Sequence, residues 1–264
     1  MKELTTRKGL NLYTMRFILL SLLAGGVFSL MSPAEARGQK SGLLSRTVKV
    51  GDNAYGYQIY MPAGLVGKEK LPVIVFLHGI GQRGEGGFVK GAAAALAGQY
   101  LDRVPAIVVL PQCARGRYWS DPEMDKMVVA SLKQTVAEFN ADEERLYLIG
   151  VSMGGYGAWH MAAEHEGTFA SIVSICGGSP LRTADRFNTI ARKVGQTPVW
   201  VFHGAEDRIV PVSESRQLVA ALREVKGNVR YNEYPGVGHN VWLNAMQEPE
   251  LMPWLLSHRR QAAK

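Results

Sequence analysis

A serine set between glycines is the residue of this chain best placed to do chemistry. It is Ser152, in Gly150-Val151-Ser152-Met153-Gly154, and it lies between the apolar segment LYLIG and a segment rich in small residues, GGYGAWHMAA. A G-x-S-x-G motif at a strand-to-helix junction holds its serine on a sharp, strained turn. The hydroxyl then lies at the helix N-terminus, where free amides favour developing negative charge. The pattern predicts a nucleophile; the alternative is a serine in an ordinary glycine-rich turn.

The elements that must position this serine follow from the hydrophobic pattern. Segments 43–50 and 55–61 predict an antiparallel hairpin, because Gly51-Asp52-Asn53 between them favours a turn. Helical spacing of apolar residues predicts helices from Met124 to Phe139 and from Leu218 to Val225, the second ended by Gly227. The runs typical of buried parallel strands are 73–77, 106–110, 146–151, 171–175, 199–202 and 229–234. This alternation predicts one α/β domain with a mostly parallel sheet and helices on both faces.

Four motifs in a fixed order extend the prediction. They are LPVIVFLHGIGQRG, LYLIGVSMGGYGAW, VWVFHGAEDRIVP and YPGVGHNVW. Together they resemble the α/β-hydrolases, above all the serine esterases of the feruloyl-esterase, polyhydroxybutyrate-depolymerase and phospholipase/carboxylesterase-like branches. The resemblance covers about residues 55 to 256. It implies a single-domain α/β-hydrolase fold.

A serine hydroxyl needs a base, and the base needs an orienting acid. In this fold the chain order is serine, then acid, then histidine. His239, in a loop after the last predicted strand, is the predicted base, with a surface loop histidine as the alternative. Asp207, directly after the strand VWVF, is the predicted acid, and Asp185 is the second candidate. The remaining histidines are interpreted as structural or as surface residues: His78, His160, His165, His203 and His258.

Acyl transfer also needs amide donors for the oxyanion. The resemblance implies the amides of Met153, just after the nucleophile, and of Ile80, in the loop after the first central strand.

The connection 176–198 is short at a place where lid domains are often inserted in this fold, which predicts an open cleft with no large lid. Tyr118, Trp119 and Trp242 are candidate cleft walls that could stack on a ring or a sugar; plain packing is the alternative. Cys113 and Cys176 follow strands that should lie well apart, so we expect two free thiols. Neither a Cys/His cluster nor an H-E-x-x-H motif occurs in the sequence, so we expect no metal and no cofactor.

The N-terminal segment 1–36 has the layout of a secretory signal peptide. Basic residues precede the apolar run FILLSLLAGGVFSL, and an A-x-A pattern ends at Ala36. The run is short for a bilayer span, which needs about 20 residues. An uncleaved signal anchor is the alternative, and Met1 and Met15 both stay open as the start. Cleavage would leave residues 37–264 as the catalytic domain, in the periplasm or secreted.

Composition narrows the class of protein. The chain has 264 residues, 47% hydrophobic and 20% charged, which excludes disorder as the dominant state. Two cysteines exclude a disulfide scaffold. The net charge of +7 first suggests nucleic acid, but the basic residues after the leader are scattered, so a solvated basic surface is favoured.

These observations predict an exported serine hydrolase that cleaves small or polymer-linked carboxylic esters through an acyl-enzyme. A peptidase or acyltransferase with the same three residues is the alternative among enzymes. A catalytically inactive binding module on the same fold is the alternative from another class.

Overall fold

A computed structural model describes residues 42–65, 70–84 and 104–260 of the chain. The core is one eight-stranded sheet in the order β1-β2-β4-β3-β5-β6-β7-β8. Its strands are β1 (Gly42–Val50), β2 (Asn53–Met61), β3 (Val73–Leu77), β4 (Ile107–Pro111), β5 (Leu146–Val151), β6 (Ser171–Ile175), β7 (Val199–Gly204) and β8 (Val229–Tyr234). The hairpin β1–β2 is antiparallel and β2 runs antiparallel to β4, whereas the six strands β3 to β8 are mutually parallel. The predicted mostly parallel α/β sheet is therefore confirmed.

The hydrophobic runs located the central strands well, because these strands are buried on both faces. β3, β5 and β6 begin and end where the sequence predicted, and so does the less buried edge strand β8. β7 runs two residues further than predicted, since His203 and Gly204 pair with Glu233 and Tyr234 of β8. This extension brings His203 to the edge of the sheet where the candidate site lies.

Alternate residues of the central strands enter two separate apolar cores. Val73, Val75 and Leu77 of β3 face one core, and Ile74 and Phe76 face the other. Successive side chains of a strand point to opposite faces of the sheet. Because both faces are buried here, other elements must pack on each of them.

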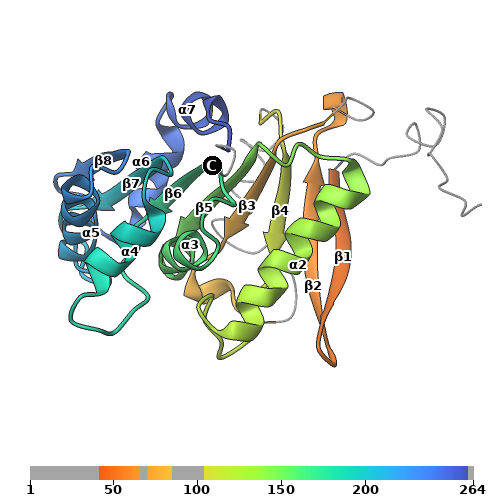
Figure 1. The fold of residues 1–264 in the computed structure, drawn as a ribbon, viewed down its shortest axis with the longest axis horizontal. Helices are drawn as coiled ribbons and strands as arrows, with labels where there is room; N and C mark the ends of the chain where they lie inside the picture. Colours follow the sequence, from red (N-terminus) through yellow and green to blue (C-terminus); the bar gives the residue numbers. More distant parts are fainter. Residues whose placement is uncertain (1–41, 66–69, 85–103, 261–264) are drawn as a thin grey trace, which may run out of the picture.

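Helices supply that cover on both faces (Figure 1). On one face lie α2 (Pro122–Phe139), α3 (Met153–Glu164), α4 (Arg186–Val194) and α5 (Ser213–Glu224). On the other lie α6 (Trp242–Gln247) and α7 (Leu251–Ser257). The described residues also contain the short 3₁₀ turns η2 (Ala63–Leu65), η3 (Ile80–Gln82) and η5 (His239–Val241).

The end of α5 differs in detail from the prediction. Lys226, not Gly227, adopts the left-handed backbone conformation, with φ of 56°. Gly227 donates its amide to Leu222 O at 2.7 Å, and a Cβ on it would lie 2.9 Å from Gly195 O. Glycine is needed here for close packing and not for its backbone angles.

The connection 176–198 contains α4 and loops, as expected for a fold without an inserted lid at this point. The predicted signal peptide, residues 1–36, lies outside the described residues. Among the helices that the structure describes, none combines the length and the apolar character needed to cross a membrane.

Candidate active site

Ser152 stands on a strained turn between β5 and α3. Its φ of 56° and ψ of −116° lie far from the favoured regions for a residue with a side chain. Its amide donates to Ile175 O at 2.9 Å, which ties the turn to β6. A Cβ on Gly150 would lie 1.9 Å from Gly154 O, and one on Gly154 would lie 1.9 Å from Leu77 O. The two glycines of the motif are thus required by the close approach of backbone segments.

His239 reaches this serine from the loop after β8. Its Nε2 lies 2.8 Å from Ser152 Oγ. The loop is packed against the end of β7, because a Cβ on Gly204 would come within 2.3 Å of Val237 O. Glu206 also donates its amide to Val237 O at 3.0 Å. These backbone contacts therefore fix the position of the His239 imidazole.

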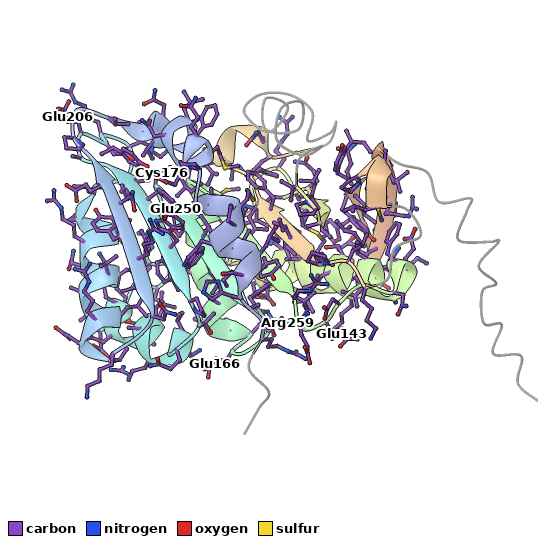
Figure 2. The ribbon with its side chains drawn as sticks, turned by 90° about the horizontal axis from the view of Figure 1, so that it is seen from above. Glu143, Glu166, Cys176, Glu206, Glu250 and Arg259 are labelled. Atoms are coloured by element: carbon purple, nitrogen blue, oxygen red, sulfur yellow. The ribbon has the colours of Figure 1, made fainter. Side chains whose placement is uncertain are left out.

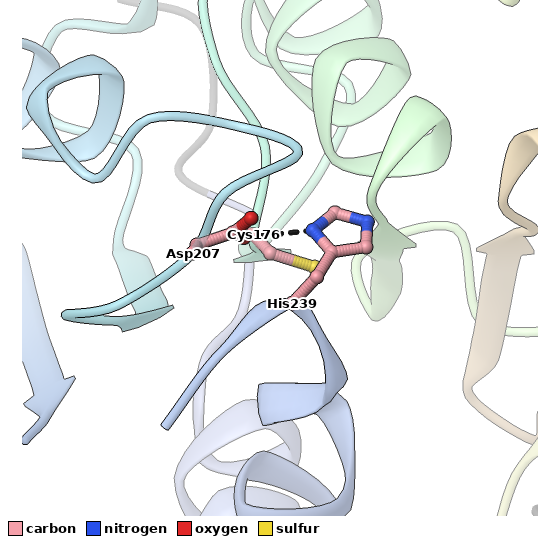
Figure 3. Close-up of side chains that lie close together, drawn as sticks. All are labelled: Cys176, Asp207 and His239. Carbon is pink, nitrogen blue, oxygen red and sulfur yellow. Dashed lines mark hydrogen bonds and ion pairs between the residues drawn. The ribbon is translucent and has the colours of Figure 1, made fainter. Parts of the chain in front are cut away.

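Asp207 contacts the other side of the imidazole (Figure 3). Its Oδ2 lies 2.7 Å from His239 Nδ1, and its Oδ1 accepts the amides of Ile209 and Val210 at 2.8 and 2.9 Å. Burial by itself raises the pKa of this carboxyl. The hydrogen bonds from His239, Val210 and Ile209 outweigh that effect, so the pKa lies below its usual value. The carboxylate is therefore charged at neutral pH.

His203 is a contact of the acid that the sequence did not single out. It is fully buried, with Nε2 3.0 Å from Val210 O and 3.3 Å from Asp207 Oδ2. Its Nδ1 lies 2.6 Å from Ser215 Oγ. Burial lowers the pKa of the ring, which stays neutral at pH 7. In the sequence, the four-residue spacing between His203 and Asp207 is only a weak signal that the two side chains meet. They come into contact because β7 is longer than predicted.

The competing residues lie elsewhere. Asp185, the second candidate acid, precedes α4 and pairs with Arg192 at 2.6 Å. His160 and His165 both contact Asp125, with Nε2 to Oδ1 distances of 3.2 and 2.8 Å. Glu206, next to Asp207 in sequence, is exposed at the edge of the molecule (Figure 2).

The two amides expected to hold the oxyanion begin helices beside the serine. Ile80 is the first residue of η3 and Met153 the first of α3, so neither amide has an acceptor within its own helix. The loop before Ile80 lies against the nucleophile, since a Cβ on Gly79 would be 3.7 Å from Ser152 Cβ. The amide of Gly79 donates to Gln82 Oε1 at 3.0 Å, which holds the loop in shape.

His78 and Trp119 contact the backbone of this loop. His78 Nδ1 lies 2.8 Å from Gly79 O, and its Nε2 accepts the amide of Cys113 at 3.1 Å. Burial lowers the pKa of the imidazole to about 4, so the ring is neutral at pH 7. Trp119 is 1% exposed and donates its indole N–H to His78 O at 2.9 Å.

The expectation that Trp119 forms a cleft wall is therefore wrong. The indole packs into the core because Gly157 of α3 leaves room for it: a Cβ there would lie 2.6 Å from Trp119 Cβ. Its neighbour Tyr118 is 49% exposed, and Arg83 lies over its ring at 5.2 Å. Trp242 begins α6 and packs against the core partly buried. Tyr118 and Trp242 stay candidates for contact with a substrate.

Both cysteines are free and buried, and β3 and β5 separate the strands that precede them, as the sequence predicted. Burial raises the pKa of each thiol to about 12, so neither competes with Ser152 as a nucleophile. Cys176 lies inside the molecule at the end of β6 (Figure 2). Its sulfur, an Asp207 oxygen and a His239 nitrogen lie within 4.8 Å of one another. Sequence reasoning missed this cluster because its members come from three separate loops.

The arrangement is suited to one kind of chemistry. A hydroxyl, an imidazole and a charged carboxylate form a continuous hydrogen-bonded chain, and the helices that begin at Ile80 and Met153 lie beside it. Such a chain can move a proton from the serine to a leaving group while the serine attacks a carbonyl.

Comparison with known proteins points to the same chemistry. The sequence model of the phospholipase/carboxylesterase family matches residues 116–250, which is half of the chain. The crystal structure of a thermostable esterase superposes with a TM-score of 0.72 at 31% identity, covering 83% of this chain and 63% of that one.

Two curated relatives carry related names. Carboxylesterase SOBER1 of Arabidopsis thaliana is 25% identical over 119 residues, 45% of this chain and 51% of that protein. Esterase LipC of Mycobacterium tuberculosis is 24% identical over 217 residues, 64% of this chain and 52% of that protein. The chain thus spans about half the length of these relatives.

Proposed function

Because the chain belongs to the phospholipase/carboxylesterase family, with an α/β-hydrolase fold, we propose that it hydrolyses carboxylic esters as a serine esterase. The observation that carries the proposal is the unbroken chain from Ser152 Oγ through His239 to Asp207, with contacts of 2.8 and 2.7 Å. The esterase names of the relatives support the same class of substrate.

In the proposed first step, Ser152 Oγ attacks the ester carbonyl and His239 Nε2 takes its proton. The amides of Ile80 and Met153, each the first residue of its helix, hold the oxyanion. His239 then gives the proton to the departing alcohol, which leaves the acyl group on Ser152. Water, deprotonated by His239, attacks the acyl-enzyme and releases the acid.

Asp207 orients His239 and stabilises its protonated form. The carboxylate is well suited to this task because it is charged and three groups fix it: His239, Ile209 and Val210. It keeps the Nδ1 proton on its own side, which leaves Nε2 free to accept the proton of the serine.

The proposed substrates are small or polymer-linked esters. The exposed ring of Tyr118 and the partly buried ring of Trp242 are the proposed contacts with the acyl or alcohol group. A panel of esters of increasing acyl length, with feruloyl, acetyl-sugar and polyester substrates, would define the preference.

The test of the proposal is turnover of short-chain nitrophenyl esters by the wild type and by Ser152→Ala. We expect the variant to lose on the order of 10⁴-fold or more in kcat. Equal rates in the two proteins would refute the proposal. A fluorophosphonate should label the wild type at Ser152, and lack of labelling would favour a binding module. Faster cleavage of peptides than of matched esters would favour the peptidase alternative. Transfer of the acyl group to an added alcohol in place of water would favour the acyltransferase alternative.

We also propose that the protein is exported, with cleavage after Ala36. The support is the charge, apolar run and A-x-A layout of residues 1–36. Expression of the full chain in a bacterial host, followed by fractionation and N-terminal sequencing, should give a periplasmic or secreted protein that starts at Arg37. A cytoplasmic protein that keeps the leader would contradict export, and a membrane-bound one would indicate the uncleaved anchor.

A further inference from the structure

A thiol that the proposed mechanism does not use lies directly against its acid and base. Cys176 directly follows β6 in a left-handed backbone conformation, with φ of 41°, and its side chain is fully buried. Its amide donates to Phe202 O at 2.8 Å, which fixes the residue between β6 and β7. The sulfur is therefore held in place by the sheet.

Three different types of potential metal ligand lie close together at this point (Figure 3). A thiol, an imidazole and a carboxylate lie within 4.8 Å of one another, and the Asp207 Oδ2 to His239 Nδ1 distance is 2.7 Å. In a tetrahedral zinc site with bonds of about 2.0–2.3 Å, neighbouring donors lie about 3.4–3.6 Å apart. The imidazole and carboxylate need to separate, and the sulfur to approach, by only about 1 Å to reach that spacing.

We propose that Cys176, Asp207 and His239 form a binding site for a thiophilic divalent cation such as Zn²⁺, and that the bound ion switches off ester hydrolysis. Sulfur and imidazole ligands favour zinc over magnesium or calcium. A water molecule completes the fourth position. The imidazole is 27% exposed at its side chain, so an ion reaches the buried pair by displacement of this ring.

The inhibition follows from the proton balance. The free imidazole carries its proton on Nδ1, which faces Asp207, and accepts at Nε2, which faces Ser152. An ion bound at Nδ1 moves that proton to Nε2. The ring then has no lone pair for the proton of the serine. The thiol of Cys176 loses one proton to solvent, so each bound ion releases one proton and the affinity rises with pH.

The other thiol provides a matched control. Cys113 is equally buried, but its sulfur contacts Arg117 O at 3.4 Å, and the guanidinium groups of Arg83 and Arg117 act on it. The carboxylate of Asp121 also acts on this thiol, but among the described residues Cys113 belongs to no group of three side chains placed to hold a metal ion. Cys113→Ser therefore removes one buried thiol and leaves the proposed site complete.

The first experiment measures binding without reference to activity. Co²⁺ is titrated into the metal-free full chain and the thiolate-to-cobalt charge-transfer absorption is recorded. We expect one Co²⁺ per chain, displaced by Zn²⁺, in the wild type and in Cys113→Ser. The band should be absent in Cys176→Ser and in Cys176→Ala. A wild type without the band, or a band that persists in both Cys176 variants, overturns the site.

The second experiment measures the switch, and only this half rests on the proposed function. Hydrolysis of a nitrophenyl ester is followed with increasing Zn²⁺, each variant being normalised to its own rate in a chelator. We expect the Zn²⁺ concentration for half inhibition to rise about 10-fold or more in Cys176→Ser and to stay unchanged in Cys113→Ser. Equal inhibition of wild type and Cys176→Ser overturns the switch. A chain with no ester activity would refute the proposed function, and the Co²⁺ spectra would still decide the metal site.

Discussion

The carboxylate of Asp207 lies 2.7 Å from the imidazole of His239, measured from Oδ2 to Nδ1, and it is held in place without a substrate. The second oxygen of the carboxylate accepts two backbone amides, from Ile209 and Val210, so the group cannot rotate away. Hydrogen bonds, with His239 first among them, outweigh burial and keep the pKa of the carboxyl below its usual value. Orientation of the imidazole is thus built into the loop after β7.

Replacement of this carboxylate should remove most of the catalytic power and leave the fold in place. In Asp207→Asn the amide favours the wrong imidazole tautomer, so we expect kcat for a nitrophenyl ester to fall about 10⁴-fold with little change in KM. Asp185→Asn is the matched control, because Asp185 pairs with Arg192 away from the site. Equal losses in the two variants would contradict the assignment of Asp207.

His203 should act through Asp207 as a positioning residue. In His203→Leu the carboxylate loses its neighbour at 3.3 Å, and we expect kcat to fall about 10-fold with KM unchanged, as for the loss of a hydrogen bond to a charged group. In His203→Gln an amide N–H can take the place of Nε2–H and should restore most of kcat. Steady-state kinetics on folded protein decide the matter: a Leu variant with full kcat would rule out the role.

The sequence could predict that Ser152, Asp207 and His239 lie together, because the fold fixes their order and each follows a recognisable strand. It could not predict the state of Trp119. Whether that ring is buried depends on Gly157, a residue of α3 that is distant in sequence and leaves space beneath the loop. Nor could it find Cys176 beside Asp207, because that contact exists only once β6 and β7 are neighbours in the sheet.

Trp119 and Tyr118 are adjacent in sequence and should respond differently to substitution. Trp119→Phe removes the indole N–H that donates to His78 O and opens a small cavity, so we expect the free energy of unfolding to fall by about 1–3 kcal/mol, with a lower kcat because the loop that begins at Gly79 is held less firmly. Tyr118→Ala removes an exposed ring and should change the free energy of unfolding by less than about 1 kcal/mol. It should instead raise KM for aromatic esters. Denaturant titrations and steady-state kinetics of both variants test these expectations. A fully stable Trp119→Phe together with a strongly destabilised Tyr118→Ala would contradict them.

Gly154 should tolerate no side chain at all. A Cβ there would lie 1.9 Å from Leu77 O, a backbone atom that cannot move without disturbing β3, so Gly154→Ala should lose about 3 kcal/mol or more in free energy of unfolding. Gly56→Ala is the control, since a Cβ at Gly56 meets no atom within 4 Å. We expect its urea midpoint to match that of the wild type. A soluble, fully active Gly154→Ala would show that the turn is less tightly packed than described.

The neutral ring of His78 should make the stability of the fold depend on pH. Burial lowers its pKa to about 4 from 6.5, because the protonated ring would lose Nε2 as acceptor for the Cys113 amide and would face the charge of Arg83. Between these two values the unfolded chain binds more protons than the folded one, so the free energy of unfolding rises with pH through this window, by up to about 3 kcal/mol. This contribution to the free energy of unfolding is lost again as the pH falls from 6.5 towards 4.

Urea denaturation of wild type and His78→Gln at several pH values isolates this contribution. The glutamine can accept the Cys113 amide but does not titrate, and His203 and Asp207, whose pKa values are also lowered, contribute equally in both proteins. We therefore expect a shallower rise for the variant between pH 4 and 6.5, by about the same 3 kcal/mol. Parallel pH dependences in the two proteins would mean that His78 is not held in its neutral form by the loop it supports.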